Sequence, residues 1–181
     1  MASIQEKLQK FTLGESLKDE FVSICLVRDI HNSKELLEIL MKKNHPKLLE
    51  LTQDQSRQFV ILMNARMIYN LEHILISLSI CLIKRKFQSK TKTKAFETEV
   101  IYNMSPSTNI SATLKTFGIT DTTKDVACLF VNIDKNDLIE DFLRLIQGQV
   151  DFIDNLSKVH EISEIAKVSI KNKFKLLFNF K

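Results

Sequence analysis

The sequence predicts a single α/β domain, with a mixed sheet of about four or five strands flanked by helices. Short apolar runs typical of buried strands alternate along the chain with amphipathic segments typical of helices. The 181 residues are 44% hydrophobic and 27% charged, which is enough to build one core. No internal repeat, low-complexity tract or Pro/Gly-rich linker divides the chain, so we expect one domain over residues 1–181.

Three apolar runs predict strands that are buried on both faces. They occupy residues 21–27, 59–63 and 126–133, and they lack the alternation of a half-exposed strand. Residues 97–104 do alternate, with Val100, Tyr102 and Met104 among the side chains of one face. We therefore expect a further strand with two unequal faces there.

The first two predicted helices follow from capping and periodicity. Asn32 or Ser33 caps a helix that ends near Asn44 and Pro46. Residues 71–87 carry apolar side chains on both sides, which predicts a central and largely buried helix.

Two shorter helices are predicted in the second half of the chain. Ile110, Leu114 and Phe117 share one stripe of a short helix, and Gly118 closes it at a position that we expect to be left-handed. A further helix covers residues 138–146. The apolar stripe of the short helix is large for its length, which suggests a contact beyond the sheet.

Composition excludes several classes of function. There are only three glycines, far apart in the chain, so neither a dinucleotide fingerprint nor a Walker-type phosphate loop is present. The three cysteines form no C-x-x-C pair, which argues against a disulfide framework and a zinc knuckle and favours a reducing compartment. The formal net charge of +4 permits nucleic acid as a partner without requiring it.

No arrangement of side chains predicts catalysis. No two histidines or cysteines have the helical spacing of a metal-ligand pair, so we expect no enzyme, no metal and no cofactor. A thiol-dependent enzyme is a remaining alternative, and it requires Cys81 or Cys128 to be reactive in the folded state. The longest apolar stretch, residues 74–83, is half a membrane span, and no signal peptide is evident, so we expect a soluble intracellular protein without a membrane partner. Both the cytoplasm and the nucleus fit, because the basic residues 84–94 could serve as an import signal or as an RNA contact.

Residues 84–94 hold a concentrated basic patch without acidic residues. Its two interpretations are a solvated loop that maintains solubility and a surface that contacts RNA phosphates. His73, at the start of the predicted central helix, is also open to two interpretations: it satisfies helix-end backbone groups, or it is a ligand-facing donor. The cations of the patch are Lys84, Arg85, Lys86, Lys90, Lys92 and Lys94.

Several segments together resemble one known family. Residues 98–119 read TEVIYNMSPSTNISATLKTFGI, residues 59–75 read FVILMNARMIYNLEHIL, and residues 27–38 read VRDIHNSKELLE. They resemble the PRPK-binding protein family, the small regulatory subunit of the KEOPS (EKC) tRNA-modifying complex. The match extends over about 21–133 and is lost at 1–20 and 169–181. It is carried by Asn64, Ala65, Glu72, His73, Glu99, Ser105, Pro106, Asn109, Ile110, Lys115, Phe117, Gly118 and Ile119.

The resemblance implies an adaptor. In this family the subunit binds the small lobe of the atypical kinase/ATPase subunit directly, contacts other KEOPS subunits indirectly, and helps to recruit tRNA by its 3′ CCA end. Another subunit transfers the threonylcarbamoyl group to the adenosine beside the anticodon. The alternative is a stand-alone RNA-binding module that uses the basic patch without a kinase.

Two sets of residues follow as site predictions. Phe117 and Ile119 are expected to border the kinase-binding surface, and Ile110 and Leu114 belong to the same stripe but are expected nearer the core. Phe117→Glu should then abolish kinase binding in a folded monomer; unfolding would instead place Phe117 in the core. For tRNA we expect Asn64, Arg66 and His73 nearest the 3′ end, and the six cations of the basic patch on phosphates.

Overall fold

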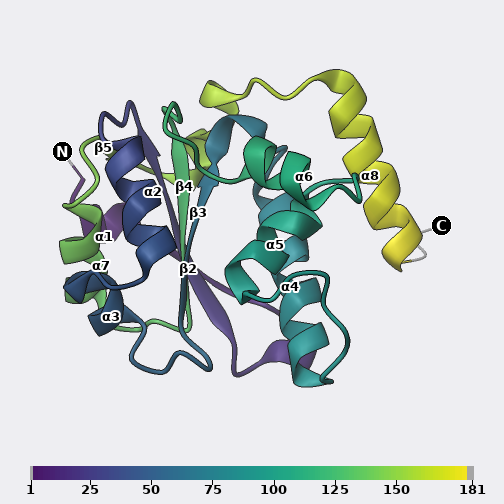
Figure 1. Ribbon diagram of the computed structural model, residues 1–181, viewed down its shortest axis with the longest axis horizontal. Helices are drawn as coiled ribbons and strands as arrows, with labels where there is room; N and C mark the ends of the chain where they lie inside the picture. Colours follow the sequence, from purple (N-terminus) through teal and green to yellow (C-terminus); the bar gives the residue numbers. More distant parts are fainter. Residues whose placement is uncertain (1, 179–181) are drawn as a thin grey trace.

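The computed structural model describes residues 2–178 and contains one antiparallel sheet between two layers of helices (Figure 1). Its strands lie in the order β1-β2-β4-β3, and β5 also pairs with β2. Every pair is antiparallel, so the predicted fold class is confirmed, whereas the parallel pairs of a mixed sheet are absent from these strands. The strands are β1 (Gln9–Thr12), β2 (Phe21–Arg28), β3 (Phe59–Asn64), β4 (Val126–Val131) and β5 (Gln149–Asp151).

The helices divide between the two faces of the sheet, with α1, α2, α3 and α7 on one side and α4, α5 and α6 on the other (Figure 1). The α-helices are α1 (Ile4–Lys7), α2 (Ser33–Lys42), α3 (Pro46–Leu51), α4 (Leu71–Lys86), α5 (Phe96–Met104), α6 (Ile110–Phe117), α7 (Asn136–Leu143) and α8 (Glu164–Phe178). Three short 3-10 helices, η1 (Glu15–Leu17), η2 (Ala65–Met67) and η3 (Ile153–Val159), occupy the connections.

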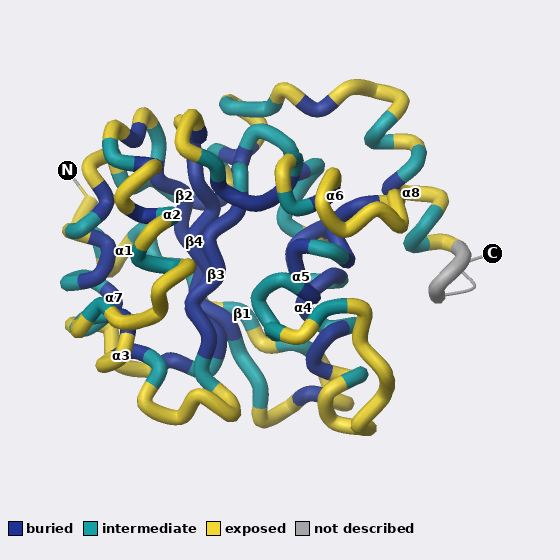
Figure 2. The backbone as a smooth tube through the Cα atoms, viewed as in Figure 1, coloured by how far each residue is buried: buried dark blue, intermediate teal, exposed yellow. Residues whose placement is uncertain are grey.

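The sheet is buried on both faces because its central strands, β2 and β4, carry apolar side chains toward both helical layers (Figure 2). Ile24 of β2 and Leu129 of β4 belong to the core on the α4 and α5 side. Val27 and Phe130 belong to the second core, under α2, α3 and α7. Continuous apolar runs therefore predicted these strands correctly.

The predicted strand at residues 97–104 is wrong, because this segment forms helix α5. The helix is enclosed by its neighbours, and it buries Val100, Ile101 and Met104 together with the polar Glu99 and Asn103. A helix that buries a polar side chain on one face and apolar side chains on others loses its simple 3.6-residue pattern. The remaining alternation resembles that of a strand.

Helix α8 packs on the outer side of the α4 and α5 layer. Ile170 is buried in that core, and Ala166 and Phe174 pack against it. The Lys173 ammonium donates to the carbonyl oxygens of Asn103 at 2.8 Å and Ser105 at 2.6 Å, at the C-terminal end of α5. Burial lowers the pKa of Lys173 to about 8. Residues 179–181 lie outside the described residues.

Gly118 ends α6 in an extended conformation, with φ of −76°, so the predicted left-handed cap is wrong. A Cβ at this position would lie 2.6 Å from the carbonyl oxygen of Leu114. Glycine is thus required by close backbone approach rather than by a positive φ.

We expect Gly118→Ala to lower the free energy of unfolding by about 2 kcal/mol, because the methyl group must displace backbone atoms of α6. Urea denaturation at neutral pH measures the change. Lys115→Ala, at an exposed position of the same helix, is the matched control and should change stability far less. Equal stability of Gly118→Ala and the wild type would contradict the close approach.

Candidate functional site

A groove with a volume of about 750 Å³ lies along the outer edge of β3. Four consecutive residues of this strand, from Phe59 to Leu62, contribute to its lining. The strand is at the end of the strand order, so one of its edges faces the groove instead of another strand. The groove thus lies at the uncovered edge of the sheet, between the two layers of helices.

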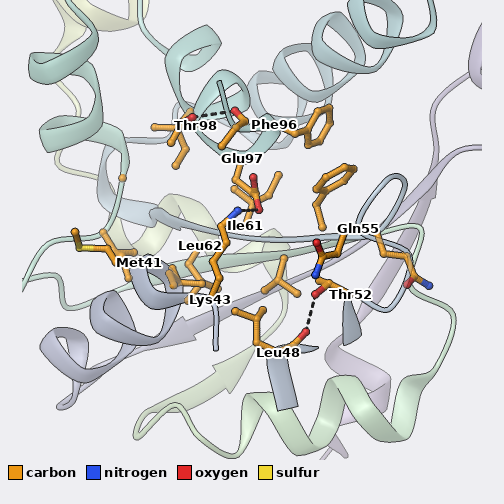
Figure 3. Close-up of a pocket in the computed structure, with 18 of the residues that line it drawn as sticks. Met41, Lys43, Leu48, Thr52, Gln55, Ile61, Leu62, Phe96, Glu97 and Thr98 are labelled. Carbon is orange, nitrogen blue, oxygen red and sulfur yellow. Dashed lines mark hydrogen bonds and ion pairs between the residues drawn. The ribbon is translucent and has the colours of Figure 1, made fainter. Parts of the chain in front are cut away.

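The two walls of the groove are mainly apolar and come from opposite helical layers (Figure 3). Met41 of α2 and Leu49 of α3 stand on one wall with 76% and 42% of their surface exposed. Phe96 and Ile101 of α5 and Leu114 of α6 form the other wall. Exposed apolar side chains that gather beside a groove mark a surface for binding a partner.

Charged groups stand at two places around the groove. The Lys43 ammonium, directly after α2, lies 2.7 Å from the Glu97 carboxylate of α5 and joins the two walls (Figure 3). Arg85 lies over the rings of Phe59 and Phe96, at 4.9 Å and 5.7 Å from their centroids. Both side chains of the Lys43–Glu97 pair reach solvent, so we expect it to contribute at most about 1 kcal/mol and to open easily.

The residues predicted to bind the kinase lie in different places from those expected. Leu114 and Ile119 line the groove, and Ile110 is 37% exposed. Phe117 is only 4% exposed, and its ring packs edge-on against His73 at a centroid distance of 5.9 Å. The expectation of Phe117 as a surface residue with Ile110 in the core is therefore wrong, and Phe117→Glu should unfold the protein.

The residues predicted to bind tRNA divide into two groups at opposite ends of α4. His73 is in the first turn, whereas Lys84, Arg85 and Lys86 form the last turn, about 16 Å further along at 1.5 Å per residue. The predicted loop therefore begins later, at Phe87. Arg85 and Lys94 also line the groove. They therefore lie in the same cavity as Leu114 and Ile119, two of the residues predicted to bind the kinase.

Residues 87–95 connect α4 to α5 and carry the remaining lysines of the basic patch, and we call this segment the basic loop. It is held by a buried carboxylate that was not predicted to contact it. Glu99 accepts hydrogen bonds from the ammonium of Lys84 at 3.0 Å and from the backbone N–H groups of Lys92 and Thr93 at 2.9 Å each. Burial raises the pKa of Glu99, but the hydrogen bonds to Lys84, Thr93 and Lys92 outweigh it and lower the pKa overall. The side chains of Lys90 and Lys92 are exposed on this anchored loop, and that of Lys86 is exposed at the end of α4.

Asn64 and Arg66 use their polar groups inside the fold. The guanidinium of Arg66 pairs with Asp125 at 2.6 Å and also with Glu161, which raises the pKa of Arg66. The side chain of Asn64 accepts from the Arg66 backbone N–H at 3.3 Å and donates to the Thr116 carbonyl oxygen at 3.3 Å. These contacts fix the corner between β3 and η2.

His73 is buried, and both of its ring nitrogens have backbone partners. This agrees with the interpretation in which His73 satisfies backbone groups at a helix end, and not with a ligand-facing donor. Nδ1 accepts from the Tyr69 backbone N–H at 3.2 Å, and Nε2 donates to the carbonyl oxygen of Met104 at 2.7 Å. Burial, with a smaller contribution from the Lys173 charge, lowers the pKa of His73 to about 4. The neutral ring therefore joins α4 to the end of α5.

Cys81 and Cys128 are poorly suited to act as nucleophiles at neutral pH. Burial, assisted by the Glu99 charge, raises the pKa of Cys81 to about 12. Burial beside Cys25 raises the pKa of Cys128 well above its ordinary value. These pKa values oppose the thiol-dependent alternative.

The described residues offer neither a metal-ligand cluster nor a membrane-spanning helix. Within residues 2–178 no group of three or more His, Cys, Asp and Glu side chains is placed to hold a metal ion. Over the same part of the chain, the helices are too short or too polar to cross a membrane.

A helix-covered antiparallel sheet with an apolar groove at its open edge has a surface suited to binding another protein. Comparison with known families agrees, because the model of the kinase binding protein CGI-121 family matches residues 27–175. The chain belongs to this family, which confirms the resemblance carried by residues 98–119. No sequence pattern marks the groove residues Met41, Lys43, Leu49 and Glu97, because they come together only when α2 and α3 pack opposite α5.

Several relatives are named as subunits of the EKC/KEOPS complex. The subunit cgi121 of Aspergillus fumigatus is 28% identical over 152 residues, which cover 81% of this chain and 74% of that protein. The subunit TPRKB of Danio rerio is 30% identical over 59% of this chain and 61% of its own length. The subunit CGI121 of Candida glabrata is 27% identical over 59% of this chain and 64% of its own length.

His73 should make stability depend on pH. Its folded-state pKa, about 4, is below the ordinary 6.5, so the unfolded chain binds the proton more tightly. The contribution of the neutral His73 ring to the free energy of unfolding is therefore complete above pH 6.5. It is lost as the pH falls toward 4, by about 3 kcal/mol in total. Urea denaturation between pH 7 and 4 measures it. His73→Gln should flatten this decline, and the exposed His31→Gln should retain it. Parallel declines in the wild type and His73→Gln would contradict the assignment.

Proposed function

We propose that this protein is a non-catalytic regulatory subunit of a KEOPS (EKC) complex that binds the complex's atypical kinase/ATPase subunit at the groove along β3. The observation that carries this proposal is the pair of exposed apolar side chains, Met41 and Leu49, beside an apolar cavity. Membership of a family described as kinase binding proteins supports it, as do the names of the relatives as EKC/KEOPS subunits.

We further propose that the basic loop contacts tRNA near its 3′ CCA end and helps to deliver it for threonylcarbamoylation. Exposed lysines on an anchored loop suit phosphate contact, because Lys90 and Lys92 project into solvent while Glu99 holds the backbone between them and α5. The loop also adjoins the groove through Lys94, so bound tRNA would lie close to the bound kinase.

A stand-alone RNA-binding module is the second candidate, favoured by the same exposed lysines. It differs in requiring no kinase. It predicts full tRNA affinity when the groove is disrupted and the kinase is absent, whereas the adaptor requires the groove for its activity in the complex.

For kinase binding, we expect a one-to-one complex with the kinase subunit of the same organism, measured by calorimetry. Met41→Glu should weaken it at least about thirtyfold, the effect of an interface residue that contributes about 2 kcal/mol. Ile165→Glu is the matched control, because Ile165 is an apolar residue of α8 that is 81% exposed and lies away from the groove. A complex that resists Met41→Glu, or that Ile165→Glu weakens equally, would reject the groove as the kinase site.

For tRNA binding, we expect Lys90→Gln with Lys92→Gln to weaken the affinity and to reduce the slope of log affinity against log salt by about 1.5. The slope falls because fewer counterions are released from the nucleic acid. Lys34→Gln with Lys115→Gln removes the same charge from exposed positions outside the loop and is the control. Filter binding at several salt concentrations measures both, and an unchanged slope in the loop variant would assign the patch to solubility alone.

A further inference from the structure

The free edge of β3 directs unpaired backbone groups into the groove. The N–H of Ala65 donates to the carbonyl oxygen of Asp125 at 2.9 Å and continues the β3–β4 register. Because backbone polar groups alternate sides along a strand, Ile61 then faces β4, whereas Val60 and Leu62 face away from it. Among the described residues, the antiparallel bridge between Met63 and Gly118 is the pairing on this edge. Because Met63, like Ile61, faces β4, this bridge engages the carbonyl of Leu62 and the N–H of Asn64, and it leaves Val60 and the N–H of Leu62 free toward the groove.

The groove has the shape that an added strand requires. A new strand beside β3 would lie about 4.8 Å away and would point its side chains alternately to the two faces of the sheet. On one face they would meet Phe96 and Leu114, and on the other Leu40 and Leu48. Apolar surface is thus available on both sides, as at the center of the existing sheet.

Charge distinguishes the two ends of the groove. Arg85 and Lys94 stand at the end where β3 begins, next to the stacked rings of Phe59 and Phe96. Among the described side chains, neither cation forms an ion pair with a carboxylate. An antiparallel neighbour of β3 would end at this point, so the cations complement a carboxylate at the C-terminal end of the added segment.

We propose that β3 receives an extended apolar segment of a partner protein, which pairs antiparallel with it through Val60 and the N–H of Leu62 and places an acidic residue at its C-terminal end beside Arg85 and Lys94. Such strand addition supplies affinity through main-chain hydrogen bonds and specificity through the side-chain pockets. The inference rests on the proposed function when the partner is the kinase subunit. It extends that function by specifying which kind of segment binds.

The Lys43–Glu97 ion pair joins the two walls of the groove, so an entering segment either passes beside it or separates it. Because the pair is solvent-exposed, its separation costs little compared with the main-chain hydrogen bonds gained.

The test uses short random peptides displayed on phage and selected on the folded wild-type protein. Val60→Pro removes the outward N–H while leaving the ladder to β4 intact, and proline is tolerated on an edge strand in this orientation. Val60→Ala shortens the same side chain but keeps the N–H. We expect selected peptides to combine an apolar run with a following acidic residue, and to lose at least about tenfold in affinity with Val60→Pro but not with Val60→Ala.

Lys94→Glu provides a second test that does not alter the backbone of β3. We expect it to weaken the selected peptides, whereas Lys34→Glu, an exposed charge reversal outside the groove, should not. Hydrogen exchange should slow at the amides of Val60 and Leu62 when a peptide binds. Peptides that bind equally to all these variants, or a selection without enrichment, would overturn the inference.

Parallel measurements with the kinase subunit separate this inference from the proposed function. A kinase complex that is indifferent to Val60→Pro and Lys94→Glu would leave kinase binding in place and reject strand addition for that partner. If the selected peptides respond to these variants as expected but no kinase complex forms, strand addition would stand and kinase binding would be rejected. Sedimentation of the protein alone tests a second copy as the occupant: a dimer lost in Val60→Pro would reassign the edge to self-association and overturn the partner-segment proposal.

Discussion

Burial of both faces of the β2–β4 pair is the constraint on which the rest of this structure depends. Two strands that are apolar on each side need a helical layer on each side, and the chain supplies α4 and α5 for one and α2, α3 and α7 for the other. Helices that cover the faces of a sheet do not cover its edge. The groove beside β3 is thus a direct consequence of how the core is built, and its apolar walls are the outer margins of the two cores.

Buried polar groups then fix how the layer formed by α4 and α5 is assembled. His73 joins the start of α4 to the end of α5, and Glu99 joins the end of α4 to α5 and the basic loop. Lys173 brings α8 onto the same helix end. Each of these side chains would be costly to bury without its partners. Their contacts therefore define the relative positions of the helices more strictly than apolar packing alone.

Much of the fold followed from the sequence, because the strands at 21–28, 59–64 and 126–131 and the helix at 71–86 carry local patterns. What failed depended on contacts between distant segments. Glu99 has the polarity of a solvent-facing residue, but Lys84 and the loop at 92–93 make its burial favourable, so α5 resembled a strand. The apolar stripe of α6 was found, although sequence could not distinguish its inner member, Phe117, from its exposed member, Ile110. The groove itself belongs to no single segment.

An apolar edge strand is ordinarily a hazard, since it invites pairing with other chains. The sequence of β3 contains no charge that would discourage such pairing. Protection comes instead from the surroundings: α2, α3 and α5 form walls on both sides, Lys43 and Glu97 join those walls, and Gly118 pairs with one end of the strand. Such a recess obstructs the edge of another folded sheet but has room for a single extended chain. The features that protect β3 from unselective pairing are thus the same ones that would restrict its occupant to a slender segment.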